Sequence, residues 1–221
     1  MKTPSTPHEE RTRGISRESM QRLQQRHFHK LLIHVWNRSA FYRDYYSSHG
    51  VREKSLDDMS IGDLPLLPKK LLIANFDRAV TDPRLRRKEL EEWFESHRDP
   101  NETFCQDMIV IHGSGTSGDI GIYAYDRRAW TIADTTMAGR LPLPENYPAG
   151  KTKIAFYVAA NGHFATVSMA SSMPKSVYDT LILSLMDSVE QTLTQLNAFQ
   201  PHRLTGYSSS VAQLAELALD G

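Results

Sequence analysis

The sequence has little of three things: cysteine, net charge and long apolar runs. Its one cysteine, Cys105, has no partner for an internal disulfide, and an unpaired thiol suits a reducing compartment, so we expect a cytoplasmic protein. Lys plus Arg and Asp plus Glu both number 26, which leaves no basic excess to neutralise a nucleic acid. The longest purely apolar run, 154–160, is far shorter than the roughly 20 residues that cross a bilayer. Neither nucleic acid nor membrane is an expected partner.

What the sequence does have is the composition of a globular protein. Its 221 residues, 40% hydrophobic and 24% charged, allow one large domain or two small ones. Residues 1–15 are polar and aperiodic, which predicts a disordered lead-in. Helical periodicity predicts a helical segment over 16–100, and β-branched runs that begin near Met108 predict an α/β region over 101–221, which we interpret as one incomplete domain.

The helical segment has recognisable start and stop signals. Ser16 suits an N-cap, and one buried face is predicted from the spacing of Met20, Leu23, Phe28, Leu31 and Val35. A helix over 41–48 is expected to end at Gly50. Pro68 suits the first position of a short helix, and a charged helix is predicted over 85–97, with one edge docked through its few apolar residues.

The second half alternates strands and helices. An almost continuous apolar run over 153–159 predicts a strand that is buried on both faces, as in a parallel sheet. The other expected strands lie at 108–112, 120–125 and 203–207, and the expected helices follow Asp126, Ser188 and Ser210. This order predicts an α/β fold, in which a helical N-terminal segment is followed by a mainly parallel sheet flanked by helices.

The most informative stretch is the glycine loop, Gly113-Ser114-Gly115-Thr116-Ser117-Gly118. Its glycines allow close approach of the backbone to a ligand, and its hydroxyls and N–H groups are suited to phosphate oxygens. The spacing fits G-x-G-x-x-G, but a dinucleotide loop opens into a helix, whereas a strand is predicted after this one. A Walker A loop is excluded because Asp119 follows, and the other protein-kinase motifs are absent. Taken alone, the loop also fits a surface hairpin without a ligand.

The surroundings of the loop favour a ligand. The loop resembles the Ser/Thr/Gly-rich phosphate loop of the acyl-adenylate-forming enzymes, and its flanks are similar to the phenylacetate–coenzyme A ligase branch. The resemblance runs over residues 27–221 and is carried, in order, by SAFYRDYYSSHGV, DLPLLPKKLLIANF, the loop itself and LTGYSSSVAQLAELA. It implies that the fold is a partial N-terminal domain of such an enzyme.

The resemblance also implies a chemistry. ATP with magnesium would activate a carboxylic acid, for example an aromatic one, as an acyl-adenylate, and a thiol such as coenzyme A would then take the acyl group. The implied phosphate-binding residues are Ser114, Gly115, Thr116, Ser117 and Gly118. The implied acid pocket contains His163, Phe164 and Tyr207. No residue is assigned a catalytic role, and no metal-ligand set is found.

Two departures from the family leave an alternative open. The family loop often continues with one residue, then Pro, then Lys or Thr; in this chain those places hold Asp119, Ile120 and Gly121. The family's later adenine-binding motifs and catalytic Lys have no counterpart here. We therefore expect a truncated enzyme that is inactive alone, with apolar faces that favour a homo-oligomer or a complementary chain. The alternative is a non-catalytic nucleotide-binding or partner scaffold.

Overall fold

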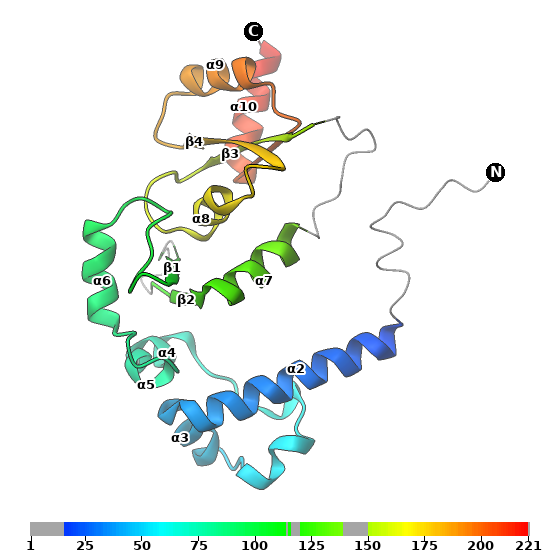
Figure 1. Ribbon diagram of the computed structural model, residues 1–221, viewed down its shortest axis with the longest axis vertical. Coiled ribbons are helices and arrows are strands. Elements are labelled where there is room, and N and C mark those ends of the chain that lie inside the picture. The colour runs from blue at the N-terminus through cyan, green and yellow to red at the C-terminus, as the bar shows by residue number, and fades with distance from the viewer. Residues whose placement is uncertain (1–15, 114, 116–119, 139–149, 221) are drawn as a thin grey trace, which may run out of the picture. The chain divides into compact units, whose positions relative to one another are not determined.

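The computed structural model describes residues 16–113, 115, 120–138 and 150–220 (Figure 1). The chain divides into two compact units, Met1–Arg87 and Lys88–Gly221, which we call unit 1 and unit 2. The predicted lead-in over residues 1–15 lies outside the described residues. Among the residues that are described, no helix combines the length and apolar character needed to span a membrane.

Unit 1 is helical throughout its described part. Its elements are α2 (Arg17–Arg38), α3 (Ala40–Ser48), the 3-10 helices η1 (Glu53–Asp58) and η2 (Ile61–Asp63), α4 (Lys69–Ala74) and α5 (Phe76–Ala79). The predicted cap is confirmed, because the Ser16 hydroxyl accepts a hydrogen bond from the Ser19 N–H at 3.1 Å. Pro68 is the N-cap residue directly before α4, one position earlier than predicted.

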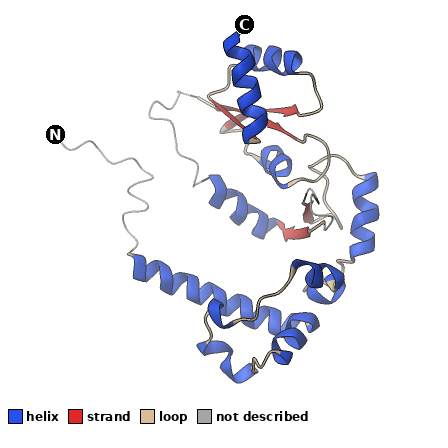
Figure 2. Cartoon of the chain, turned by 180° about the vertical axis from the view of Figure 1, so that it is seen from behind, coloured by secondary structure: helices blue, strands red, loops and turns tan. Residues whose placement is uncertain are grey.

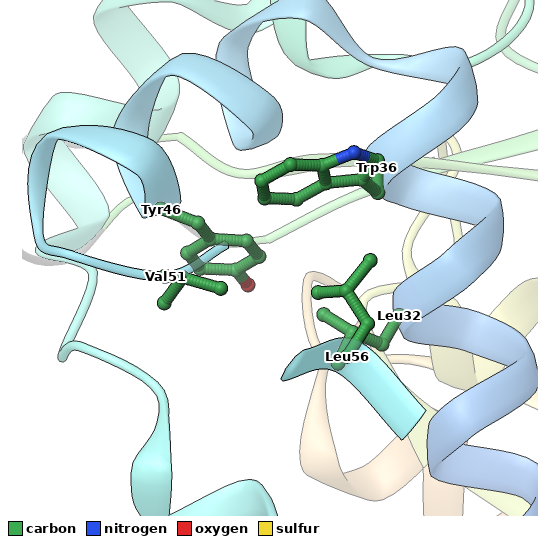
Figure 3. Close-up of a cluster of buried hydrophobic side chains, with 5 residues drawn as sticks. All are labelled: Leu32, Trp36, Tyr46, Val51 and Leu56. Carbon is green, nitrogen blue, oxygen red and sulfur yellow. The ribbon is translucent and has the colours of Figure 1, made fainter. Parts of the chain in front are cut away.

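The core of unit 1 forms where α2 meets α3 and η1. Its fully buried members are Leu32, Trp36, Tyr46, Val51 and Leu56 (Figure 3). The predicted face of α2 is wrong in part, because Leu31 is 61% and Met20 40% exposed. The buried positions of α2 instead repeat at four residues, which is the spacing that keeps side chains on one face of a helix.

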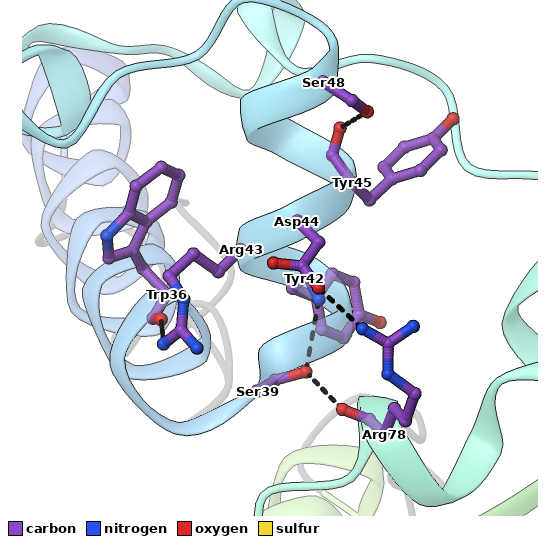
Figure 4. A network of polar contacts seen from close by, with 8 residues as sticks. All are labelled: Trp36, Ser39, Tyr42, Arg43, Asp44, Tyr45, Ser48 and Arg78. Atoms are coloured by element: carbon purple, nitrogen blue, oxygen red, sulfur yellow. Dashed lines mark hydrogen bonds and ion pairs between the residues drawn. The ribbon is translucent and has the colours of Figure 1, made fainter.

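A buried serine links distant parts of unit 1. Ser39 is fully buried; its hydroxyl accepts a hydrogen bond from the Tyr42 N–H at 3.3 Å and donates one to the Arg78 carbonyl at 3.0 Å (Figure 4). Arg78 also forms an exposed ion pair with Asp44, at 2.6 Å. Ser39 therefore caps α3 and ties it to α5 with a single side chain.

All the strands that the structure describes lie in unit 2 (Figure 2). Its elements are α6 (Arg87–Ser96), β1 (Met108–His112), β2 (Ile122–Asp126), α7 (Arg127–Ala138), β3 (Thr152–Val158), α8 (Ala165–Ser172), β4 (Tyr178–Ser184), α9 (Val189–Phe199), β5 (Arg203–Gly206) and α10 (Ser208–Asp220). The sequence analysis predicted most of these elements and missed α8 and β4. The chain is therefore an α/β protein.

The strands form two sheets. β1 and β2 make an antiparallel pair, and β4, β3 and β5 make a separate three-stranded parallel sheet in that order. The prediction of a mainly parallel sheet is therefore correct only for the second sheet. The strands on either side of the glycine loop are adjacent in sequence and pair with each other as a hairpin, which requires no crossover helix.

The central strand β3 is covered on both faces. Ala155 and Tyr157 pack with Leu183 and Leu214 on the face covered by α9 and α10. Ile154 and Val158, which alternate with them along the strand, are also buried, and α8 lies on that opposite face (Figure 1). The chain runs from β3 through α8 to β4, then through α9 back past β3 to β5. The direction of winding therefore reverses at β3.

Candidate ligand site at the glycine loop

The glycine loop closes a well-paired hairpin. β1 and β2 are in register from Met108 opposite Asp126 to His112 opposite Ile122. One step further, the Gly113 N–H donates to the Gly121 carbonyl at 2.9 Å. The Gly113 amide therefore closes the hairpin and is not available to a ligand. The predicted strand–loop–strand arrangement is confirmed.

Only one of the five implied phosphate-binding residues lies within the described residues. Ser114, Thr116, Ser117 and Gly118 lie outside them. Gly115 has a φ of +65°, in the left-handed region that favours glycine. A Cβ at this position would lie 2.6 Å from Cγ1 of Ile120, so a side chain would also clash with the far end of the loop. Both the backbone conformation and the nearby Ile120 side chain therefore favour glycine at position 115.

The base of the loop is attached to the turn that follows β3. The His112 N–H donates to the His163 carbonyl at 2.9 Å, and His112 forms a parallel bridge with Phe164. The ring centroids of His112 and Phe164 are 4.5 Å apart. Nδ1 of His112 also lies 3.1 Å from the Gly113 carbonyl. The glycine loop therefore begins beside the segment that leads from β3 to α8.

That segment leaves β3 at the switch point of the parallel sheet. β3 and β5 are parallel neighbours, with Tyr157 opposite Gly206. The turn after β3 and Tyr207 after β5 consequently leave from the same edge of the sheet. In open α/β sheets, ligands bind outside the carboxyl ends of the strands where the winding reverses. The two segments that carry the implied acid-pocket residues, one after β3 and one after β5, therefore leave the same edge of the sheet. That edge suits ligand binding.

The three implied pocket residues differ in their surroundings. His163 is only 1% exposed and packs against the rings of Trp93 and Phe94, with centroid distances of 4.4 and 5.6 Å. Phe164 lies against His112. Tyr207 is 50% exposed at the start of α10. An acid pocket lined by these residues stays a prediction.

The aromatic cluster around His163 comes from α6 and the segment after it. Leu90 is fully buried, which confirms that one edge of this charged helix is docked. Trp93 stacks on His97 and meets Phe104 edge-on. The sequence analysis did not connect this helix with the glycine loop. The four-residue spacing of Trp93 and His97 was an available signal, because such residues share a helix face.

Burial controls the charge of His163. It lowers the pKa of the imidazole below its usual value, and the neighbouring His112 and His97 lower it further. A hydrogen bond with the His97 backbone and the charge of Glu102 oppose this shift. The neutral form is therefore favoured. Within the described part of the chain, no group of three or more His, Cys, Asp or Glu side chains is arranged to hold a metal ion.

No protein-family model matches the chain, and no curated protein sequence matches it.

Proposed function

We propose that the chain is the N-terminal part of an acyl-adenylate-forming enzyme, in which the glycine loop binds the phosphates of ATP. One observation carries the proposal. The hydrogen bond from the His112 N–H to the His163 carbonyl ties the base of the loop to the segment that leaves the carboxyl edge of the parallel sheet after β3. A phosphate loop at this edge would lie beside the residues that follow β3 and β5, where a second substrate has access.

The proposed reaction has two steps. A carboxylate oxygen of the acid attacks the α-phosphorus of magnesium-bound ATP, and pyrophosphate leaves. A thiolate such as that of coenzyme A then attacks the acyl carbonyl, and AMP leaves. Donors that are fixed around the leaving pyrophosphate stabilise its charge. That role falls to the hydroxyls of Ser114, Thr116 and Ser117 and to the N–H groups of Gly115 and Gly118. The acid would lie near His163, Phe164 and Tyr207.

A second candidate is a nucleotide-binding or partner scaffold without catalysis. Asp119 and Gly121 favour it, because Gly121 stands where the resembled family often has Lys or Thr, and Asp119 adds a negative charge beside the loop. A carboxylate next to a triphosphate repels it unless a magnesium ion intervenes. Under this candidate the loop binds a nucleotide, but no acid binds beside it.

Calorimetric titration with magnesium-ATP tests the phosphate site. We expect saturable binding that is weakened about tenfold or more in Thr116→Val, because a hydrogen bond to a charged group is worth about 1.5–3 kcal/mol. Thr194→Val on α9 is the matched control, since its hydroxyl only donates to the Glu190 carbonyl. Absence of heat with both ATP and pyrophosphate would refute the site.

Acid binding separates the two candidates. With ATP present, aryl and fatty acids should bind to a ligase fragment, and Phe164→Ala should weaken that binding. A scaffold should bind ATP and no acid. Pyrophosphate exchange is expected to be absent for the isolated chain. A robust exchange signal would show that the chain is catalytically complete.

A further inference from the structure

His163 is the most enclosed titratable side chain at the base of the loop. It is 1% exposed, and its Nε2 has no hydrogen-bond partner among the described residues. The rings of Trp93 and Phe94 lie against it, and they exclude water without offering an acceptor. A neutral imidazole tolerates this environment better than an imidazolium, because burial penalises the charge more than the His97 backbone hydrogen bond and Glu102 offset it.

The titratable groups around His163 come from three segments. His97 directly follows α6, and Asp99 and Glu102 lie in the turn after it. His112 is the last residue of β1. Glu102 accepts a hydrogen bond from the Asp99 N–H at 3.3 Å, and the Asp99 carboxylate is occupied with Asn101. Both carboxylates are exposed or half-buried, whereas the two histidines oppose a positive charge on the ring.

The backbone around this ring connects the segments that hold the loop. The His163 carbonyl accepts the His112 N–H, and the Gly162 N–H donates to the Arg98 carbonyl at 3.0 Å. The turn at 162–164 therefore bridges the end of α6 and the end of β1. Displacing the His163 ring would strain both hydrogen bonds, since the ring and the two backbone groups belong to one short turn.

We propose that His163 is a proton-sensitive positioning residue, which holds the base of the glycine loop in place only while its ring is neutral. Protonation makes the ring seek water, and the turn releases the His112 N–H as the ring leaves Trp93. The proposed effect is on how firmly the base of the hairpin is held. It does not depend on which ligand the loop binds.

The direction of the pH effect follows from the lowered pKa of His163. In the released state the pKa is near its ordinary value of 6.5, and in the packed state it lies lower. The attachment is therefore complete above pH 6.5 and weakens as the pH falls below that value, because the released state binds the proton more readily. Once the pH is below the pKa that His163 has in the packed state, the attachment weakens no further.

Hydrogen exchange at the His112 amide tests this directly. Between pH 7.5 and 5.5, after correction for intrinsic exchange, we expect its protection to fall, by up to about tenfold, which is the limit that proton linkage sets for a released-state pKa of 6.5. In His163→Phe, which keeps an aromatic ring, protection should become independent of pH. His34→Phe, at an exposed position of α2, is the control and should keep the wild-type dependence.

Two further measurements keep the inference falsifiable. His112→Phe should retain the pH dependence; if that variant abolishes it and His163→Phe does not, His112 is the sensor and the inference fails. Should His163→Phe not fold, an NMR titration of the wild-type His163 ring decides. A midpoint below 6.5, with loss of the Trp93 contact at the same pH, supports the inference, and a midpoint at or above 6.5 overturns it. Neither measurement uses a nucleotide, so failure here is distinct from failure of the proposed function.

Discussion

The two units of the chain carry opposite charge. Unit 1 contains 17 Lys and Arg against 10 Asp and Glu, whereas unit 2 contains 9 against 16. Counted over residues 1–100, the imbalance is only 19 against 15, because the acidic helix α6 then falls in the first part. A chain with no net charge is thus two oppositely charged units. The zero net charge argues against a polyanionic partner for the chain as a whole. It does not argue against one for unit 1, which has an excess of basic residues.

The units also differ in how they are held together. Unit 1 relies on one cluster of five buried hydrophobic residues and on the Ser39 link between α3 and α5. Unit 2 relies on a parallel sheet with helices on both faces and on the aromatic cluster of α6. Each unit has a hydrophobic core of its own, which is the usual requirement for separate folding.

The largest expected effect tests whether the two cores are independent. Leu32→Ala in unit 1 and Leu183→Ala in unit 2 each remove a side chain that is at most 2% exposed. Each should cost its own unit about 2–5 kcal/mol, through lost burial and the cavity that remains. Urea unfolding followed by hydrogen exchange, with peptides from α2 and from β4 measured separately, should show each loss in one unit only. Equal loss in both units from either variant would mean that they unfold as one.

An intermediate effect is expected at the Ser39 link. Ser39→Ala removes the cap of α3 and leaves the Arg78 carbonyl without its buried donor. We expect unit 1 to lose about 1–2 kcal/mol, measured by thermal unfolding. Ser48→Ala, also on α3, is the matched control, because the Ser48 hydroxyl is exposed and contacts only the nearby Tyr45 carbonyl and His49 ring. A loss no greater than that of the control would mean that the link is not important for unit 1.

These differences explain how much of the fold the sequence could predict. Local signals were sufficient for the hairpin at 108–126, for the Ser188 cap of α9 and for the apolar strand β3. α8 was missed because its sequence, ATVSMASS, is small and β-branched and is buried without an amphipathic pattern. The sheet order was not predictable, since it depends on which strands meet after the crossovers and not on any single segment.

The candidate site was predictable only as a loop. The spacing of Gly113, Gly115 and Gly118 indicated close backbone approach, and the left-handed conformation of Gly115 agrees with it. The attachment of His112 to the turn at His163 joins residues 51 positions apart through a backbone hydrogen bond. No side-chain pattern encodes such a bond. The burial of His163 likewise depends on α6, which the sequence suggested only as a helix with one docked edge.

The smallest expected change in stability tests the difference in charge between unit 1 and unit 2. Arg22, Arg26 and Lys30 are exposed and follow one another at four-residue spacing along α2, so like charges face each other on the helix. Arg26→Glu replaces two repulsive pairs with two attractive ones and should stabilise unit 1 by about 0.5–1 kcal/mol at low ionic strength. The gain should shrink in 1 M NaCl, where the screening length is about 3 Å.

Glu95→Lys on α6 is the counterpart in unit 2 and should give a smaller gain of the same sign, because it relieves repulsion from Glu91. Thermal unfolding at both salt concentrations measures both changes, and destabilisation by Arg26→Glu at low salt would show that the basic face of α2 is held by interactions other than charge.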